Sequence, residues 1–300
     1  MSQIWDTSYS VPVTLTWIAV AVAAVSLFIR RRTWRIPGEV AASTAVLFLA
    51  LGTFLSSDEC NIGEALWRAT GFGYLDDFAG QLCYVSGTLA LLQHALYRVA
   101  DDAERAEIVD AFVKWPVTLL VPLMLSAMYM SPTLHDEPLA FDVMAHGSGL
   151  WGTIYRSLYL ACMLYLTLLL VHVLRTVRRT GGRGKVSVIY LLACSVSLTV
   201  TTVRVAEMVW PDVDAFDEIP VMLRATFGMI VATGAAASWL GKLWRYRSLL
   251  LRTRTTRRQR RNDTLQSHRE RLSLTSAGVT ADGDEPDPPP HQLTPANGQL

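Results

Sequence analysis

The stretch that decides the fold starts at residue 11 and reads VPVTLTWIAVAVAAVSLFI, followed directly by RRRTWR at residues 30–35. Residues 11–29 carry no charge, and as an α-helix they would rise about 28 Å, close to the roughly 30 Å of a bilayer's hydrocarbon core. Residues 1–10 contain no Lys or Arg, and the arginines after the apolar run are typical of a stop-transfer signal. The stretch therefore predicts a membrane-spanning helix and not a cleaved signal peptide.

The rest of the chain repeats this alternation of apolar blocks and charged connections. Hydrophobic residues make up 51% of the sequence and charged residues 18%. The predicted spans are Val11–Ile29, Val40–Leu55, Phe78–Val99, Phe112–Met130, Leu150–Leu174, Val186–Trp210 and Ile219–Leu243. We expect an all-α, polytopic bundle of seven transmembrane helices in residues 1–244. Residues 245–300 would form a second, cytoplasmic part.

Basic residues in the short connections predict the orientation. The connections after the first, third and fifth spans are rich in Lys and Arg, namely Arg30, Arg31, Arg32 and Arg35, then Arg98, Arg105 and Lys114, then Arg175, Arg178, Arg179, Arg183 and Lys185. The other three connections contain a single basic residue between them, Arg68. Because basic loops stay in the cytoplasm, the N-terminus should lie outside and the C-terminus inside, with the protein in the plasma membrane.

A basic run follows the last predicted span. It contains Arg245, Arg247, Arg252, Arg254, Arg257, Arg258, Arg260 and Arg261. Such a run is attracted to anionic lipids, and the predicted topology makes lipid a simpler partner than nucleic acid. From Ser273 the sequence is acidic, proline-rich and poor in apolar residues, so we expect a disordered tail.

Four ionisable residues lie within predicted spans, where desolvation is costly and function is the first hypothesis. They are Arg156, Arg204, Glu207 and Arg224. The predicted directions of the fifth, sixth and seventh spans place all four in the outer third of the membrane. Arg204 and Glu207 are three residues apart, so they share one helical face and can pair.

Three interpretations of this cluster remain open. Acids at the outer rim, such as Asp76, Asp77, Asp142, Asp217 and Glu218, would complete a network of salt bridges that locks helices together. Alternatively, the guanidinium groups line an outward-facing pocket for a small anionic ligand. In the third interpretation the arginines extend toward lipid headgroups.

Other groups of polar residues give weaker evidence for a functional site. His94 and His172 could form a proton relay or a weak metal pair, but no carboxylate is near them in sequence. The loop residues His135, Asp136, Glu137, Asp142 and His146 match no metal-ligand spacing. Cys60 and Cys83 could form a disulfide, whereas Cys162 and Cys194 fall inside spans. No metal site and no cofactor is expected.

Motifs of the common enzyme classes are missing from the sequence. It contains no Walker A loop, no HExxH and no GxSxG. The only lysine of the seventh span, Lys242, lies at its end, where it could not hold retinal at mid-span. The sequence therefore argues against an enzyme.

The acidic start of the third span, Asp76-Asp77-Phe78-Ala79-Gly80, and the segment Trp244-Arg245-Tyr246-Arg247-Ser248-Leu249 resemble a family of actinobacterial seven-helix membrane proteins. The basic first connection and the number of spans agree with that resemblance, which covers roughly residues 1–250. Members are often labelled transporters of unknown substrate, and the family supplies no catalytic residues. The resemblance implies a transporter. The alternative is a membrane sensor or scaffold that acts through its cytoplasmic loops and tail with an unidentified protein partner.

Overall fold

In the computed structural model every regular element is a helix within the described residues, which are 11–57, 62–132, 143–146, 149–179, 185–210 and 215–277. The helices are α1 (Val11–Ile29), η1 (Thr33–Arg35), α2 (Pro37–Leu55), α3 (Ile62–Thr70), α4 (Leu75–Leu96), α5 (Asp102–Val109), η3 (Asp110–Lys114), α6 (Trp115–Met130), α7 (Val143–His146), α8 (Gly149–Arg179), α9 (Lys185–Val209) and α10 (Ala215–Ala277). The η3 segment is a π-helical turn that joins α5 to α6. The all-α prediction is confirmed for these residues.

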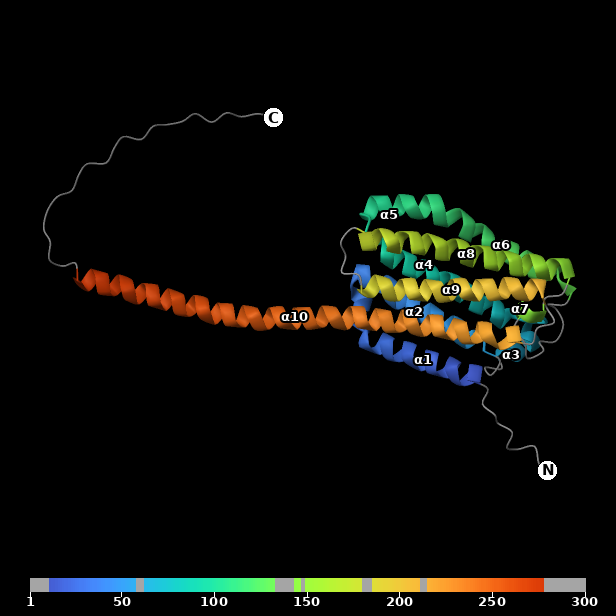
Figure 1. The fold of residues 1–300 in the computed structure, drawn as a ribbon, viewed down its shortest axis with the longest axis horizontal. Coiled ribbons are helices and arrows are strands. Elements are labelled where there is room, and N and C mark those ends of the chain that lie inside the picture. Colours follow the sequence, from blue (N-terminus) through green and yellow to red (C-terminus); the bar gives the residue numbers. More distant parts are fainter. Residues whose placement is uncertain are drawn as a thin grey trace, which may run out of the picture. The chain divides into compact units, whose positions relative to one another are not determined.

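The chain divides into two units, Met1–Lys242 and Leu243–Leu300, and α10 contributes to both. In the first unit the long helices lie alongside one another, and successive long helices run in opposite directions (Figure 1). Residues 243–277 of the second unit are helical. Ser273–Ala277, where the sequence suggested disorder, are thus the end of a helix, and the remainder of the predicted tail lies outside the described residues.

Six helices are long and apolar enough to cross a membrane: Val11–Ile29, Gly38–Leu55, Asp102–Met130, Gly149–Arg179, Val186–Val209 and Ile219–Trp244. They overlap six of the seven predicted spans and indicate a membrane-embedded protein. Their outward faces carry large apolar side chains, among them Phe28, Leu123, Leu168 and Leu192, each about half exposed or more. A surface of this kind suits lipid and not water.

The third predicted span forms α4, a helix that is not among those six. It carries Asp76, Asp77, Gln81, Gln93 and His94, which lower its mean hydropathy. More than half of its residues are nevertheless buried, and α2, α3 and α8 all pack against it. The structure confirms a helix at this position, and its burial inside the bundle explains why its sequence is polar.

Glycines bring α2 and α4 into close contact. A Cβ atom on Gly52 would lie 3.0 Å from the carbonyl oxygen of Gly80 and 3.1 Å from the Tyr84 ring. A Cβ atom on Gly87 would lie 2.8 Å from Leu49. Small residues at a helix interface allow this approach of two backbones, which is a common device in membrane bundles. The α2–α4 contact therefore fixes α4 in the interior.

Candidate functional site

Arg204 and Glu207 form a buried ion pair near the end of α9. Arg204 Nη1 donates to Glu207 Oε2 at 2.7 Å, and the two side chains are only 4% and 8% exposed. The spacing of three residues places both on one helical face, as the sequence predicted. We call the end of the bundle that holds this pair the Arg204 end.

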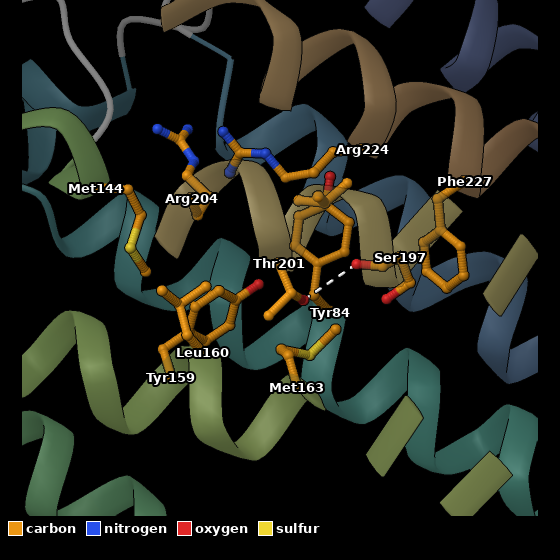
Figure 2. A pocket seen from close by; sticks show the side chains of 11 residues that line it. Tyr84, Met144, Tyr159, Leu160, Met163, Ser197, Thr201, Arg204, Arg224 and Phe227 are labelled. Atoms are coloured by element: carbon orange, nitrogen blue, oxygen red, sulfur yellow. Dashed lines mark hydrogen bonds between the residues drawn. The ribbon is translucent and has the colours of Figure 1, made fainter. Parts of the chain in front are cut away.

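A pocket opens beside this pair. It is lined by Arg204 and Arg224 together with Tyr84, Met144, Tyr159, Leu160, Met163, Ser197, Val200, Thr201 and Phe227. Figure 2 shows both guanidinium groups at the same end of the pocket, above side chains from α4, α8 and α9. Arg204 and Arg224 are 3% and 8% exposed, so their charges act in a setting from which water is largely excluded.

The pocket is small. The space open to the centre of a water molecule is about 30 Å³, whereas a single water needs roughly 10–15 Å³ measured in this way. The pocket can therefore hold a few waters or one small ion with part of its hydration. Most of its walls are apolar, and its polar groups are the two arginines and the hydroxyls of Tyr84, Tyr159, Ser197 and Thr201.

Arg156 approaches the same end from α8. Its Nη1 donates to the carbonyl oxygen of Met144 at 2.9 Å, and it interacts electrostatically with both Glu207 and Arg204. Its Nε is buried and has no hydrogen-bond partner among the described residues. The structure thus brings the four ionisable residues of the predicted cluster to one end of the bundle.

The short helix α7 is held against this cluster by α4. The backbone N–H of Val143 donates to Asp77 Oδ2 at 2.9 Å. Asp77 is therefore at the Arg204 end, as the salt-bridge interpretation requires, but it also serves the backbone of α7. The side chain of the adjacent Asp76 has a different neighbour, since its carboxylate lies against the backbone of Gly63 at the start of α3.

The remaining predicted rim acids do not decide between the interpretations. Asp142 and the side chains of Asp217 and Glu218 lie outside the described residues.

Cys60 also lies outside the described residues, so the disulfide with Cys83 stays a prediction. His135, Asp136 and Glu137 also lie outside, as does the His146 side chain.

The two histidines predicted as a pair differ in their surroundings. His94 is 3% exposed and lies between the carbonyl oxygen of Gly38, 3.1 Å from Nδ1, and Arg98 Nη2, 3.2 Å from Nε2. A carbonyl only accepts, so Nδ1 carries the proton and Nε2 accepts from Arg98. His172 is exposed on α8. Among the described residues, no three His, Cys, Asp or Glu side chains gather as a metal site would require.

Sequence reasoning missed a second charged cluster, at the opposite end of the bundle. Its centre is Arg30, predicted to lie in a loop but fully buried. Arg30 donates to Ser43 Oγ at 3.1 Å, to the carbonyl oxygen of Ala235 at 2.7 Å, and to the carbonyl and carboxylate oxygens of Glu39 at 3.1 and 2.9 Å. Lys242 pairs with the other carboxylate oxygen of Glu39. We call this end the Arg30 end.

A sequence signal for this cluster existed. Thr16, Ala19, Ala23 and Ser26 are the small or polar residues buried on α1, and their spacing of three or four residues continues to Arg30. Ser26 Oγ donates to the carbonyl oxygen of Ala232 at 2.8 Å, one turn from the carbonyl that Arg30 contacts. Arg30 thus continues the face of α1 that packs on α10. Sequence reasoning missed this because Arg30 stands in a run of arginines.

No family model matches the chain, and comparisons with curated proteins and with solved structures found no match either.

Proposed function

We propose that this chain is a seven-span membrane protein in which α4 is the seventh crossing. Its 22 residues rise about 33 Å, which is enough to cross the hydrocarbon core. Two of its polar side chains have partners inside the bundle: Tyr155 donates to Gln81 Oε1 at 2.8 Å, and the Tyr84 and Thr53 hydroxyls are 3.0 Å apart. A helix enclosed by protein need not be as apolar as one that faces lipid.

The distribution of basic residues supports an orientation with the N-terminus outside and the C-terminus in the cytoplasm. In that orientation the Arg204 end faces outward and the Arg30 end inward. Single cysteines test this in the full chain with its native cysteines replaced. Glu64→Cys on α3 and Glu104→Cys on α5 are both at exposed positions, one before and one after α4.

With seven crossings, an impermeant maleimide added to intact cells should label Glu64→Cys, and it should label Glu104→Cys only after permeabilisation. Labelling of both from the same side would show that α4 does not cross. Labelling of Glu104→Cys alone in intact cells would keep the seventh crossing and reverse the orientation.

We further propose that the pocket at the Arg204 end binds a small oxyanion. The observation that carries this is the presence of two buried arginines, on α9 and α10, at one end of one cavity. Guanidinium groups present paired donors that match the oxygens of carboxylates and related anions. The volume restricts the ligand to the size of formate, nitrate or bicarbonate. The resemblance to proteins labelled transporters agrees with such a role.

Binding is measured by thermal unfolding of the detergent-purified protein in sodium formate or sodium nitrate, at constant ionic strength. Wild type should be stabilised in a saturable way, because a ligand that binds only the folded state raises its stability. Arg224→Gln should lose this effect and Arg224→Lys should keep part of it. Arg68→Gln is the matched control, since Arg68 is exposed and pairs with Glu64 on its own helix. Equal responses in Arg224→Gln and Arg68→Gln would refute the pocket.

One observation favours a sensor as the second candidate. The same continuous helix, α10, holds Arg224 and the basic run that starts at Arg245. Flux separates the candidates: a transporter reconstituted in vesicles should move formate down its gradient, whereas a sensor should bind formate without moving it.

A further inference from the structure

The buried face of α9 is polar along most of its length. Tyr190, Cys194, Ser197, Thr201 and Arg204 are all buried there. At about 100° per residue, these five positions fall within an arc of about 80°. Chains that cross a membrane bury polar side chains only where neighbours or a water-filled space satisfy them. Polar neighbours or a water-filled space are therefore expected along this face between the Arg204 end and the Arg30 end.

The pocket supplies part of that space. It extends along α9 from Arg204 to Ser197, which are two turns or about 10 Å apart. Figure 2 shows the Thr201 and Ser197 side chains beneath the arginines, and Thr201 Oγ1 donates to the carbonyl oxygen of Ser197 at 3.1 Å. Ser197 Oγ in turn lies 3.1 Å from the Thr167 hydroxyl on α8. These hydroxyls can rotate to donate to an anion or to its water.

A second, independent observation comes from the other end of the face. Tyr190 is 3% exposed, and its hydroxyl has no hydrogen-bond partner within the described part of the chain. Its ring meets the His94 ring edge-on, with centroids 6.2 Å apart, and His94 is bonded to Arg98. A buried hydroxyl without a partner is costly, so this atom points to a group that the closed bundle does not supply.

We infer that the polar face of α9 is the route by which a small oxyanion passes between the Arg204 end and the Arg30 end. The inference rests on the proposed anion pocket and names the path that leads from it. In this structure the route is closed between Ser197 and Tyr190, where Cys194 is 1% exposed. Passage therefore requires a state in which α9 separates from its neighbours at Cys194 and water reaches Tyr190.

Two native cysteines test the route in the unaltered full-length chain. Cys194 lies on the route, whereas Cys162, which is 9% exposed, is a buried cysteine on α8 that does not line the pocket. The anionic reagent sulfonatoethyl methanethiosulfonate is added to the protein in vesicles, and mass spectrometry measures modification at each cysteine. A cysteine thiolate, which forms only where water reaches the sulfur, attacks this reagent, and a mixed disulfide forms as methanesulfinate leaves.

Cys194 should react several-fold faster than Cys162, faster with the anionic reagent than with its cationic trimethylammonium analogue, and more slowly in sodium formate. Equal rates at the two cysteines, or a preference for the cationic reagent, would overturn the route. Formate would still stabilise the protein in that case, so the pocket would stand. If formate neither stabilises the protein nor slows Cys194, both the pocket and the route fail.

Discussion

Arginines at the two ends of the bundle differ in what surrounds them. At the Arg30 end, three nitrogens of one guanidinium group donate to oxygens of Ser43, Glu39 and Ala235, and no part of the side chain is exposed. At the Arg204 end, Arg204 and Arg224 line a cavity. Both ends bury cations, and at the Arg204 end they line a space that a ligand could occupy.

This difference separates a structural arginine from a candidate binding residue. Removing the charge from Arg30 should cost stability, because Glu39 and two backbone carbonyls lose their donor. Removing the charge from Arg224 should chiefly change the response to anions. A buried charge in a membrane is therefore a functional hypothesis that has to be weighed against the contacts of its side chain.

The largest effect is expected for Arg30→Gln. Breaking a buried ion pair by removing one partner typically costs about 3–5 kcal/mol. Thermal unfolding in detergent should therefore show a strongly destabilised protein, while the formate response of the Arg204 end survives in whatever fraction folds. Arg32→Gln is the control, because Arg32 is exposed two residues away and surface changes stay within about 0.5 kcal/mol.

A double variant sharpens the comparison. Glu39→Gln removes the carboxylate that Arg30 and Lys242 share. If Arg30 and Glu39 stabilise the fold as one unit, the double variant Arg30→Gln, Glu39→Gln should lose less stability than the sum of the losses in the two single variants. Additive costs would mean that Arg30 is held by the Ser43 and Ala235 contacts and not by its ion pair.

A smaller effect is expected at the α2–α4 contact that connects the two ends. In Gly52→Ala the new methyl would meet the Gly80 carbonyl at 3.0 Å, and a backbone atom cannot move aside cheaply. Overpacking of this kind costs about 1–3 kcal/mol, less the roughly 1 kcal/mol by which Ala favours a helix over Gly. Thermal unfolding should show a moderate loss.

Gly241→Ala is the matched control for that contact. In the part of the chain that the structure describes, no atom lies within 4 Å of a Cβ atom placed there, and the residue is exposed on α10. The helix preference for Ala should then act alone, and the protein should be slightly more stable than wild type. Destabilisation in both variants to the same extent would show that the α2–α4 contact is no closer than an open helix face.

The sequence predicted the helices well because long apolar blocks have few alternatives to a helix in a bilayer. It could not show that α4 is the enclosed helix, since hydropathy records composition and not neighbours. Asp77, Gln81 and His94 lower the hydropathy of α4, yet each has its partner on another helix or loop. The partner of Asp77, the backbone of Val143, lies in a connection whose conformation no pattern predicts.

The candidate site was predictable in part. Span directions and depths correctly placed Arg156, Arg204, Glu207 and Arg224 at one end of the bundle, and the spacing of Arg204 and Glu207 predicted their ion pair. The pocket depends on how side chains of five helices pack, which sequence spacing does not determine. Arg30 does follow α1, in the connection where the sequence placed it, but its burial was missed because the arginines beside it are exposed and the positive-inside rule counts them all alike.

The smallest expected effect concerns Tyr190 and tests whether the Arg30 end is purely structural. Among the described residues its hydroxyl has no partner, so Tyr190→Phe removes an unsatisfied polar group and should raise stability by up to about 1 kcal/mol. The same change should slow formate flux in vesicles. The closed state becomes more stable, and the open, hydrated state loses a hydroxyl that could bind water or the anion. Tyr246→Phe on exposed α10 should alter neither quantity. A marked loss of stability in Tyr190→Phe would instead show that the hydroxyl holds a bound water in the closed state, and Tyr190 would then belong with Arg30 among the groups that stabilise the fold.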